Sequence, residues 1–184
     1  MRHIDVVNVV ESGSLDIEIE LSQLVDDLDP SIADYDPDKY PGVYLRFSDD
    51  APLITIYRTG KYIVTGAKSR EQAHQYRDRF LNLLTEMGVV SDPSDTPFTI
   101  QNYVFVADLE KSQNLEALAI GLGLEQTEYE PEQFPGLVYR PTDASCVLLI
   151  FASGKTIIAG ATSEETAQSA FTDLQETLEQ YQLN

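Results

Sequence analysis

The sequence predicts an α+β protein built from two copies of one half, each with the element order β-α-β-β-β-β-α. A motif over residues 35–46 returns at residues 129–140, and a second motif over residues 60–69 returns at residues 154–163. Both motifs are displaced by the same amount, because 129 − 35 = 94 and 154 − 60 = 94. Solenoid repeats are shorter, at roughly 20–50 residues. This register without gaps therefore predicts a duplicated half-domain with pseudo-two-fold symmetry.

Each half is expected to open with a strand and a short helix. Residues 4–10 and 98–106 are rich in β-branched and aromatic residues, which is typical of strands covered mainly on one face. Residues 21–28 place apolar side chains at i, i+3, i+4 and i+7, which predicts a helix with its second copy at residues 115–122. Residues 15–19 alternate apolar and acidic side chains, so this segment can be either strand or the start of the helix.

A meander of short strands follows the short helix, after a turn at Pro41-Gly42. Residues 53–57 are expected to pair with residues 62–65 through a tight turn at Gly60, and the second copy lies 94 positions later. The expected product is an antiparallel sheet with helices on one face and a bare second face.

A long helix should close each half, beginning at Ser69 in the first copy and near Ser163 in the second. We assign residues 1–90 to the first repeat, residues 91–97 to a polar, proline-containing linker, and residues 98–184 to the second repeat.

Length and composition favour a globular intracellular protein. With 184 residues, 42% of them hydrophobic, the chain suffices for one compact domain or two closely fused halves. The N-terminal apolar run is too short for a signal peptide, and no stretch approaches the ~20 apolar residues of a membrane span. Cys146 is the only cysteine, which excludes a disulfide framework and favours a packing role. We expect a soluble protein without a metal or other cofactor.

The net charge is unusual. The chain has 31 acidic and 12 basic residues, which gives a charge of −19. Affinity for DNA normally comes from Lys and Arg displacing counterions, so this charge alone argues against a nucleic-acid partner. Either the partner is not a polyanion, or the protein works in very high salt, where the Debye length falls to roughly 3 Å at 1 M. We favour the second interpretation, which places the protein in the high-salt cytoplasm of a halophile.

The bare face of the sheet is expected to carry the function. Strand alternation directs Ile54, Ile56, Tyr62 and Val64 toward the helices. The same alternation places these residues on the open face: Thr55, Tyr57, Ile63 and Thr65 in the first repeat, and Leu149, Phe151, Ile157 and Ala159 in the second. An apolar face of this size usually marks a binding site, and an additional domain or a dimer partner is the alternative cover.

The repeated residues resemble those of the TATA-box-binding proteins of archaea and eukaryotes, over nearly the whole chain. The resemblance is carried by Asn8 and Asn102, the turns at residues 40–42 and 134–136, the Gly-Lys pairs at residues 60–61 and 154–155, and the runs over residues 65–69 and 129–140. The acidic composition indicates the haloarchaeal type.

The fold of that family is a saddle whose curved antiparallel sheet straddles DNA, with the helices on its convex face. The family is itself the standard example of minor-groove wedging and kinking. The resemblance therefore implies a general transcription initiation factor that binds and bends TATA-box DNA and recruits transcription factor B and, indirectly, RNA polymerase.

The resemblance also implies a role for single residues. Asparagine amides would donate to base acceptors, aliphatic side chains would line the groove, two aromatic pairs would wedge between bases, and basic side chains would contact phosphates. The implied DNA-binding residues are Asn8, Val10, Tyr40, Arg46, Tyr57, Lys61, Ile63, Thr65, Gln101, Asn102, Val104, Phe134, Arg140, Leu149, Phe151, Lys155 and Ile157.

Some positions depart from the family pattern. The first-repeat wedge residues are Tyr40 and Tyr57, where the family usually has phenylalanine, and Ala159 replaces a threonine. A phenol can wedge, but its hydroxyl needs a hydrogen-bond partner, so we expect a softer kink at the first repeat. A divergent paralogue that uses the saddle for a protein partner or a non-TATA promoter element remains the alternative.

Two further expectations concern partners and chemistry. By the resemblance, Glu130, Glu132 and Gln133 contact transcription factor B, and a solvated acidic turn is the alternative interpretation. Only His3 and His74 are present, and no nucleophile with a base, phosphate loop or metal-ligand spacing is found. We therefore do not expect an enzyme.

Overall fold

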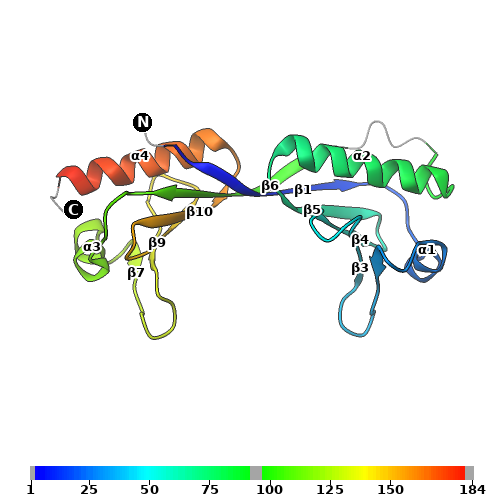
Figure 1. Cartoon of the computed structure of the whole chain (residues 1–184), viewed down its shortest axis with the longest axis horizontal. Coiled ribbons are helices and arrows are strands. Elements are labelled where there is room, and N and C mark those ends of the chain that lie inside the picture. Colours follow the sequence, from blue (N-terminus) through cyan, green and yellow to red (C-terminus); the bar gives the residue numbers. More distant parts are fainter. Residues whose placement is uncertain (1–2, 92–96, 181–184) are drawn as a thin grey trace. The chain divides into compact units, whose positions relative to one another are not determined.

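The computed structural model describes residues 3–91 and 97–180. In this part of the chain, ten strands form one antiparallel sheet and are accompanied by four helices (Figure 1). The first repeat contains β1 (Asp5–Ser14), α1 (Leu21–Asp27), β2 (Ala33–Asp34), β3 (Gly42–Leu45), β4 (Leu53–Tyr57), β5 (Lys61–Ala67) and α2 (Arg70–Glu86). The second contains β6 (Phe98–Asp108), α3 (Leu115–Leu122), β7 (Thr127–Glu128), β8 (Leu137–Tyr139), β9 (Val147–Ile150), β10 (Lys155–Ala161) and α4 (Glu164–Gln180). The predicted class and the doubled element order are confirmed.

The sequence repeats and the packing units do not coincide. The strand order in the sheet is β2-β3-β4-β5-β1-β6-β10-β9-β8-β7. Contacts divide the chain into one unit of residues 8–101 and another of residues 1–7 with 102–184. Consequently β1 and β6 each supply residues to both units. Ile4, for example, is buried in the second-repeat core, and Val6 packs against the same cluster.

Several element boundaries differ from the predicted ones. β1 runs to Ser14 and β6 to Asp108, each beyond the predicted strand end. Residues 15–20 form neither strand nor helix, and α1 begins only at Leu21. The alternation over residues 15–19 therefore reflects two buried side chains in an irregular segment and not a strand. Residues 92–96 of the predicted linker lie outside the described residues.

Each unit has one long helix on one face of its strands (Figure 1). Helix α2 is capped by Ser69, whose Oγ accepts a hydrogen bond from the backbone N–H of Gln72 at 3.1 Å. Ser163 does the same for α4, by accepting from the N–H of Thr166 at 3.1 Å. Such caps satisfy helix N–H groups that have no partner within the helix. No helix in the described ranges is long and apolar enough to cross a bilayer.

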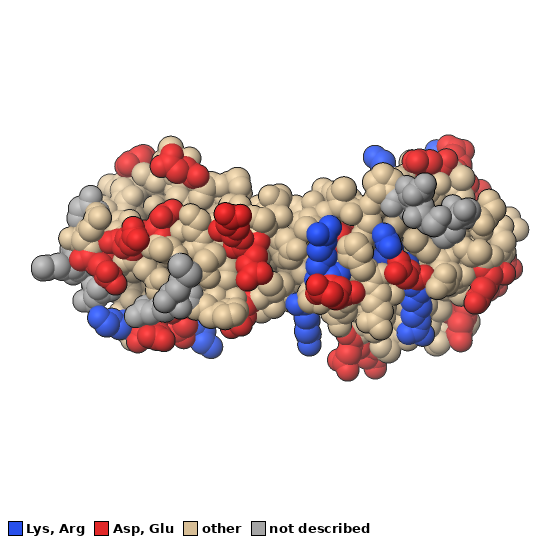
Figure 2. Space-filling view, turned by 90° about the horizontal axis from the view of Figure 1, so that it is seen from above, with Lys and Arg blue, Asp and Glu red and all other residues tan. Residues whose placement is uncertain are grey.

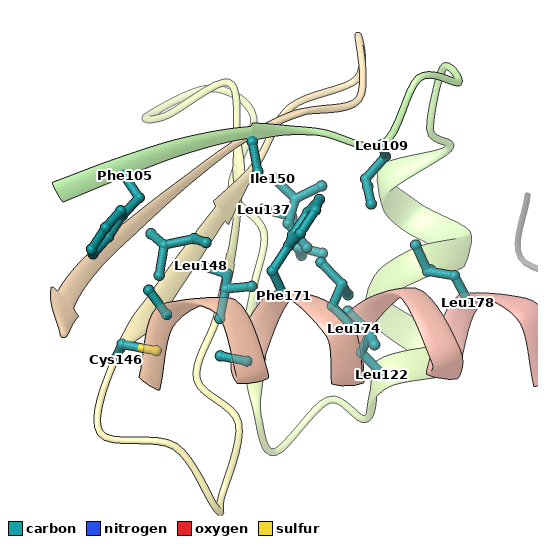
Figure 3. Packing of buried hydrophobic residues seen from close by; sticks show 14 of the residues in the cluster. Phe105, Leu109, Leu122, Leu137, Cys146, Leu148, Ile150, Phe171, Leu174 and Leu178 are labelled. Atoms are coloured by element: carbon teal, nitrogen blue, oxygen red, sulfur yellow. The ribbon is translucent and has the colours of Figure 1, made fainter. Parts of the chain in front are cut away.

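Figure 3 shows the second-repeat core, where the long helix α4 meets the sheet. Phe171 and Leu174 of α4 pack with Leu137 and Leu148 of the neighbouring strands, and all four side chains are almost fully buried. Cys146 belongs to the same cluster, and burial raises the pKa of its thiol. This environment is that of a packing residue, as the sequence predicted. The strands are thus held from the helix side, and their other side remains available.

Candidate nucleic-acid interface

Burial in the first repeat agrees with the predicted alternation at every predicted position except Thr55. Ile54 and Ile56 of β4 and Tyr62 and Val64 of β5 are all fully buried. The alternate residues of these strands, Tyr57, Ile63 and Thr65, are half-buried. Thr55 lies between two inward-facing residues, and only 7% of its surface is exposed. The first repeat therefore has an open face of aliphatic, aromatic and hydroxyl side chains.

The second repeat shows the same alternation. Leu148, Ile150, Thr156 and Ile158 are buried on the helix side. The half-buried residues on the other side are Leu149, Phe151, Ile157 and Ala159 of the hairpin, with Val104 of β6. Val10 of β1 is half-buried in the same way in the first repeat. Each open face is therefore largely apolar, as predicted.

A pocket lies beside the open face in the first repeat, with a volume of about 870 Å³. It lies against strands β1 and β5 and the loop that leads into β3. Its lining includes Ser12, Pro37, Tyr57, Lys61 and Ile63. Tyr57, Lys61 and Ile63 are predicted DNA-binding residues, so the pocket borders the candidate interface.

A β-bulge positions an asparagine in each repeat. The register of β1 with β5 passes from Val9 opposite Ala67 to Glu11 opposite Val64, so β5 carries one extra residue there. Within that bulge, Gly66 has a φ of 90°, a backbone conformation that favours glycine. The backbone N–H of Gly66 donates to Oδ1 of Asn8 at 2.8 Å.

The second repeat reproduces this arrangement. Residues Ala159 to Ala161 of β10 shift register against β6, and Gly160 between them has a φ of 88°. The N–H of Gly160 donates to Oδ1 of Asn102 at 2.8 Å. Since a backbone N–H can only donate, it fixes which end of each amide is the oxygen. The Nδ2 amine of each half-buried asparagine is left as a hydrogen-bond donor.

The second-repeat aromatic pair is formed by Phe134 and Phe151. Their ring centroids lie 5.8 Å apart at an interplanar angle of 65°. Phe134 is 36% exposed, which is unusual for so large an apolar side chain. The pair covers Gly136, where an added Cβ would lie 2.7 Å from a ring atom of Phe134. The glycine of the Pro-Gly turn thus makes room for the aromatic pair.

The first-repeat aromatic pair differs by its hydroxyls. Tyr40 and Tyr57 have ring centroids 6.1 Å apart, and their hydroxyl oxygens form a hydrogen bond of 2.5 Å. Tyr44 stacks on Tyr40 at 4.8 Å. Burial and the bond to Tyr40 raise the pKa of Tyr57 to about 12. The hydrogen-bond partner that each phenol was expected to need is therefore the other tyrosine.

The basic residues predicted to contact phosphates all have exposed side chains. Arg46 donates to the backbone oxygen of Asp49 at 3.2 Å, and Arg140 lies 3.9 Å from Glu128. Lys61 and Lys155 begin β5 and β10, each directly after the glycine of a hairpin turn. These side chains are solvated and can bind an anion.

Two groups of predicted residues lie away from the hairpins. Gln101 of β6 is exposed, and its amide donates to the side chain of Thr99 at 3.1 Å. Glu130, Glu132 and Gln133 are exposed on the loop between β7 and β8, where the Gln133 amide donates to the Glu130 carboxylate.

The first repeat contains a buried carboxylate that was not among the residues predicted from the sequence. Glu11 of β1 is fully buried, with Arg70 Nε at 3.6 Å and His74 Nε2 at 3.4 Å. Burial raises the pKa of Glu11, and the attraction of His74 and Arg70 opposes the rise. The corresponding residue 94 positions later is Phe105, which is buried in the core. The alternation of β1 could have indicated this burial, because Glu11 lies two residues after Val9 and so points to the same, helix-covered side.

The helix-covered side is charged differently in the two repeats. Helix α4 carries five acidic residues and no basic one, whereas α2 carries three of each. Figure 2 shows Asp and Glu over both units, with Lys and Arg mainly over the unit that contains α2. In the second repeat the long helix thus adds only negative charge to the side of the strands opposite the open face.

Comparisons with known proteins agree with this geometry. The family model described as transcription factor TFIID (or TATA-binding protein, TBP) matches twice, at residues 3–87 and 97–181. TATA-box-binding protein C of Halobacterium salinarum is 49% identical over 91% of this chain and 93% of its own length. The TATA-box-binding protein of Haloarcula marismortui is 43% identical over 95% and 92%, respectively.

A solved structure gives the same result for the fold. Methanococcus jannaschii TBP matches with a TM-score of 0.85 and 40% sequence identity, over 97% of this chain and 99% of the other. The matched family is one of DNA-binding transcription factors and not a family of enzymes. From its two matched repeats, its relatives and its fold, the chain belongs to the TATA-box-binding protein family.

Proposed function

We propose that this protein is a general transcription initiation factor that binds A·T-rich promoter DNA through the minor groove. The observation that carries the proposal is the asparagine pair. In Asn8 and Asn102, Oδ1 accepts a hydrogen bond from a glycine N–H, so each residue offers its amine as a donor on the largely apolar open face. In the minor groove, A·T pairs present only acceptors. The amide donors and the base acceptors are therefore complementary.

The aliphatic residues of the open face support the same choice. Val10 and Ile63 in the first repeat, and Val104 and Ile157 in the second, present only carbon atoms to a ligand. A guanine would place its 2-amino group against such a surface, where the amine would lose its hydrogen bonds to water. The apolar face thus favours A·T pairs without a direct hydrogen bond to each base.

The aromatic pairs supply the deformation. Phe134 and Phe151 form one pair against Gly136, and Tyr40, beside Gly42, forms the other with Tyr57, so the rings of each pair can enter a base step. Apolar wedges of this kind unstack a base step and kink the duplex, as is established for TATA-box-binding proteins in general. We propose that this chain bends its site by the same means.

The acidic loop is the proposed contact for transcription factor B. Glu130, Glu132 and Gln133 are exposed, and two backbone N–H groups of the loop donate to the carbonyl oxygen of Glu130 at 2.9 Å. The loop is therefore a defined turn that presents carboxylates. Once the factor is bound, RNA polymerase would be recruited through it.

Binding and bending are tested with a fluorescently end-labelled A·T-rich duplex in molar KCl. The parent protein should bind it and shorten the end-to-end distance. Phe134→Ala and Phe151→Ala should reduce the bend while keeping the parent's melting temperature. Ile120→Ala, which truncates a 72% exposed side chain of α3, is the matched control and should leave the bend unchanged. If both phenylalanine variants bend the duplex like the parent, the wedge assignment is wrong.

The partner loop is tested separately on the preformed protein–DNA complex. Glu130→Lys with Glu132→Lys should weaken the recruitment of transcription factor B without changing the affinity for DNA. Glu164→Lys with Glu165→Lys makes the same change in charge on α4 and is the control. Equal losses in both double variants would show that net charge, and not the loop, governs recruitment.

A further inference from the structure

We propose that the first-repeat aromatic pair, Tyr40 and Tyr57, tolerates a base pair that carries an amine in the minor groove, such as G·C, whereas the Phe134–Phe151 pair does not. This inference rests on the proposed function and adds that the two ends of the DNA site are recognised by different chemistry. The protein would then bind an asymmetric site in one preferred orientation.

The two aromatic pairs occupy matched positions, because 134 − 40 = 94 and 151 − 57 = 94. Their ring centroids are separated by similar distances, 6.1 Å for the tyrosines and 5.8 Å for the phenylalanines. Phe134 and Phe151 both lie against Gly136, whereas Tyr40 lies against Gly42, which is paired with Tyr57 in the sheet. The two pairs themselves differ only by two hydroxyl groups, although Tyr44 stacks on the first-repeat pair where the second repeat has Val138.

The hydroxyl pair has hydrogen-bonding capacity to spare. Tyr40 and Tyr57 share one hydrogen bond of 2.5 Å. That bond uses one of the two hydroxyl protons, and the Tyr44 hydroxyl also interacts with Tyr40, but oxygen lone pairs remain that can accept a further hydrogen bond. The 2-amino group of guanine is a donor on the floor of the minor groove. A phenol oxygen can accept from this amine, whereas a phenylalanine ring leaves it without a partner once water is displaced.

The hydroxyls are also held in place before DNA arrives. Tyr40 is stacked on Tyr44 at 4.8 Å with an interplanar angle of 21°, and it is tied to Tyr57 through the hydroxyl bond. With a pKa of about 12, Tyr57 stays protonated at physiological pH and presents a neutral hydroxyl. The pair thus needs little reorganisation to meet a base edge.

The test uses a palindromic A·T-rich site between unlike flanking sequences, so that the protein can bind in either orientation and each strand can be modified separately. Replacing one adenine by 2,6-diaminopurine in the outer step adds the minor-groove amine and keeps a pair with thymine. With the amine at one end only, the parent should place its first repeat there and lose about twofold in affinity, because one of two orientations is lost. With amines at both ends, the loss should reach about tenfold, the usual scale for one unsatisfied donor.

Two reciprocal variants locate the effect in the hydroxyls. Tyr40→Phe with Tyr57→Phe should lose about tenfold already with a single amine, because neither end then accepts it. Phe134→Tyr with Phe151→Tyr should tolerate amines at both ends with at most about a twofold loss. Both variants change only oxygen atoms, and their affinity for the unmodified duplex checks that the fold is intact.

The outcomes separate this inference from the proposed function. If the parent does not bind the unmodified duplex, the proposed function itself fails. If it binds but a single amine costs about tenfold, or if the cost is the same in Tyr40→Phe with Tyr57→Phe, the hydroxyls play no part and the inference is overturned. A parent that tolerates amines at both ends would also overturn it, because the phenylalanine pair would then not discriminate.

Discussion

The backbone N–H of Gly160 donates to Oδ1 of Asn102 at 2.8 Å, and Gly66 binds Asn8 in the same way at the same distance. In each repeat the glycine belongs to a bulge, whose freed N–H would otherwise lack a sheet partner. One bond therefore serves two purposes. It gives the glycine N–H in the bulge a hydrogen-bond partner, and it turns the amine of the asparagine away from the backbone.

This relationship predicts the effect of Asn102→Asp. An aspartate keeps an oxygen for the N–H of Gly160, so the melting temperature should stay unchanged. Its second oxygen replaces the amine donor and would face base acceptors, so affinity for A·T-rich DNA should fall at least about tenfold. Asn114→Asp is the control, because Asn114 caps α3 by accepting from Ala117 and aspartate caps equally well. Retained affinity in Asn102→Asp would place the base-contacting face elsewhere.

The Pro-Gly turn of the second repeat predicts a second variant. In Gly136→Ala the new methyl group would meet the rings of Phe134 and Phe151 at 2.7 and 3.1 Å, so the rings must shift. We expect the DNA bend to decrease, as measured by the end-to-end distance of the duplex. In Gly42→Ala the new methyl group would meet a methyl of Thr55 at 3.0 Å and the carbonyl oxygen of Ile56 at 3.1 Å before the ring of Tyr40 at 3.2 Å. That variant should affect the fold more than the aromatic pair, and an unchanged bend in Gly136→Ala would contradict the account.

The buried Glu11 predicts a dependence of stability on pH. Because its pKa is raised in the folded protein above the ordinary 4.5, folding favours the protonated carboxyl. Its contribution to stability is therefore present below pH 4.5 and is lost as the pH rises through the folded pKa. Glu11→Gln should match the parent in acid and be more stable at neutral pH, as measured by denaturant unfolding in molar KCl. Greater stability of the parent at neutral pH would mean that the His74 and Arg70 contacts outweigh burial.

The salt dependence of binding follows from the charge. The logarithm of DNA affinity normally falls linearly with the logarithm of the salt concentration. Each phosphate contact adds about 0.9 to the steepness of that fall. Here Arg46, Lys61, Arg140 and Lys155 would contribute that slope, while a net charge of −19 repels the duplex until salt screens it. The apolar contact is not weakened by salt that is excluded from the protein surface. We expect affinity to stay flat or rise from dilute to molar KCl, and a steep fall would show that phosphate contacts dominate.

Much of the fold could be predicted because the chain repeats its pattern. Helix-facing and open-face residues could be told apart from the 94-residue offset and the alternation over residues 53–57. Ile54, Tyr62 and Val64 are buried, in agreement with that prediction. Alternation works here because only one face of the sheet is covered by helices.

The details of the site could not be predicted in the same way. The bonds from Gly66 and Gly160 depend on bulges, and a one-residue register shift leaves no mark in composition or periodicity. The bond between Tyr40 and Tyr57 joins residues on different elements, so the sequence indicated only that each hydroxyl needed a partner. The assignment of the Ile4 end of β1 to the second-repeat core likewise depends on strand pairing and not on local pattern.

The central claim is that the open faces bind the minor groove of A·T-rich DNA. The most direct measurement compares three duplexes in molar KCl: an A·T-rich site, the same site with every A·T pair replaced by inosine·cytosine, and the same site with G·C pairs. Inosine·cytosine lacks the 2-amino group and so matches A·T in the minor groove, but it matches G·C in the major groove. We expect similar affinities for the A·T and inosine·cytosine duplexes and a clear loss of affinity for the G·C duplex. If the inosine·cytosine duplex binds as weakly as G·C, the protein contacts the major groove and the account is wrong.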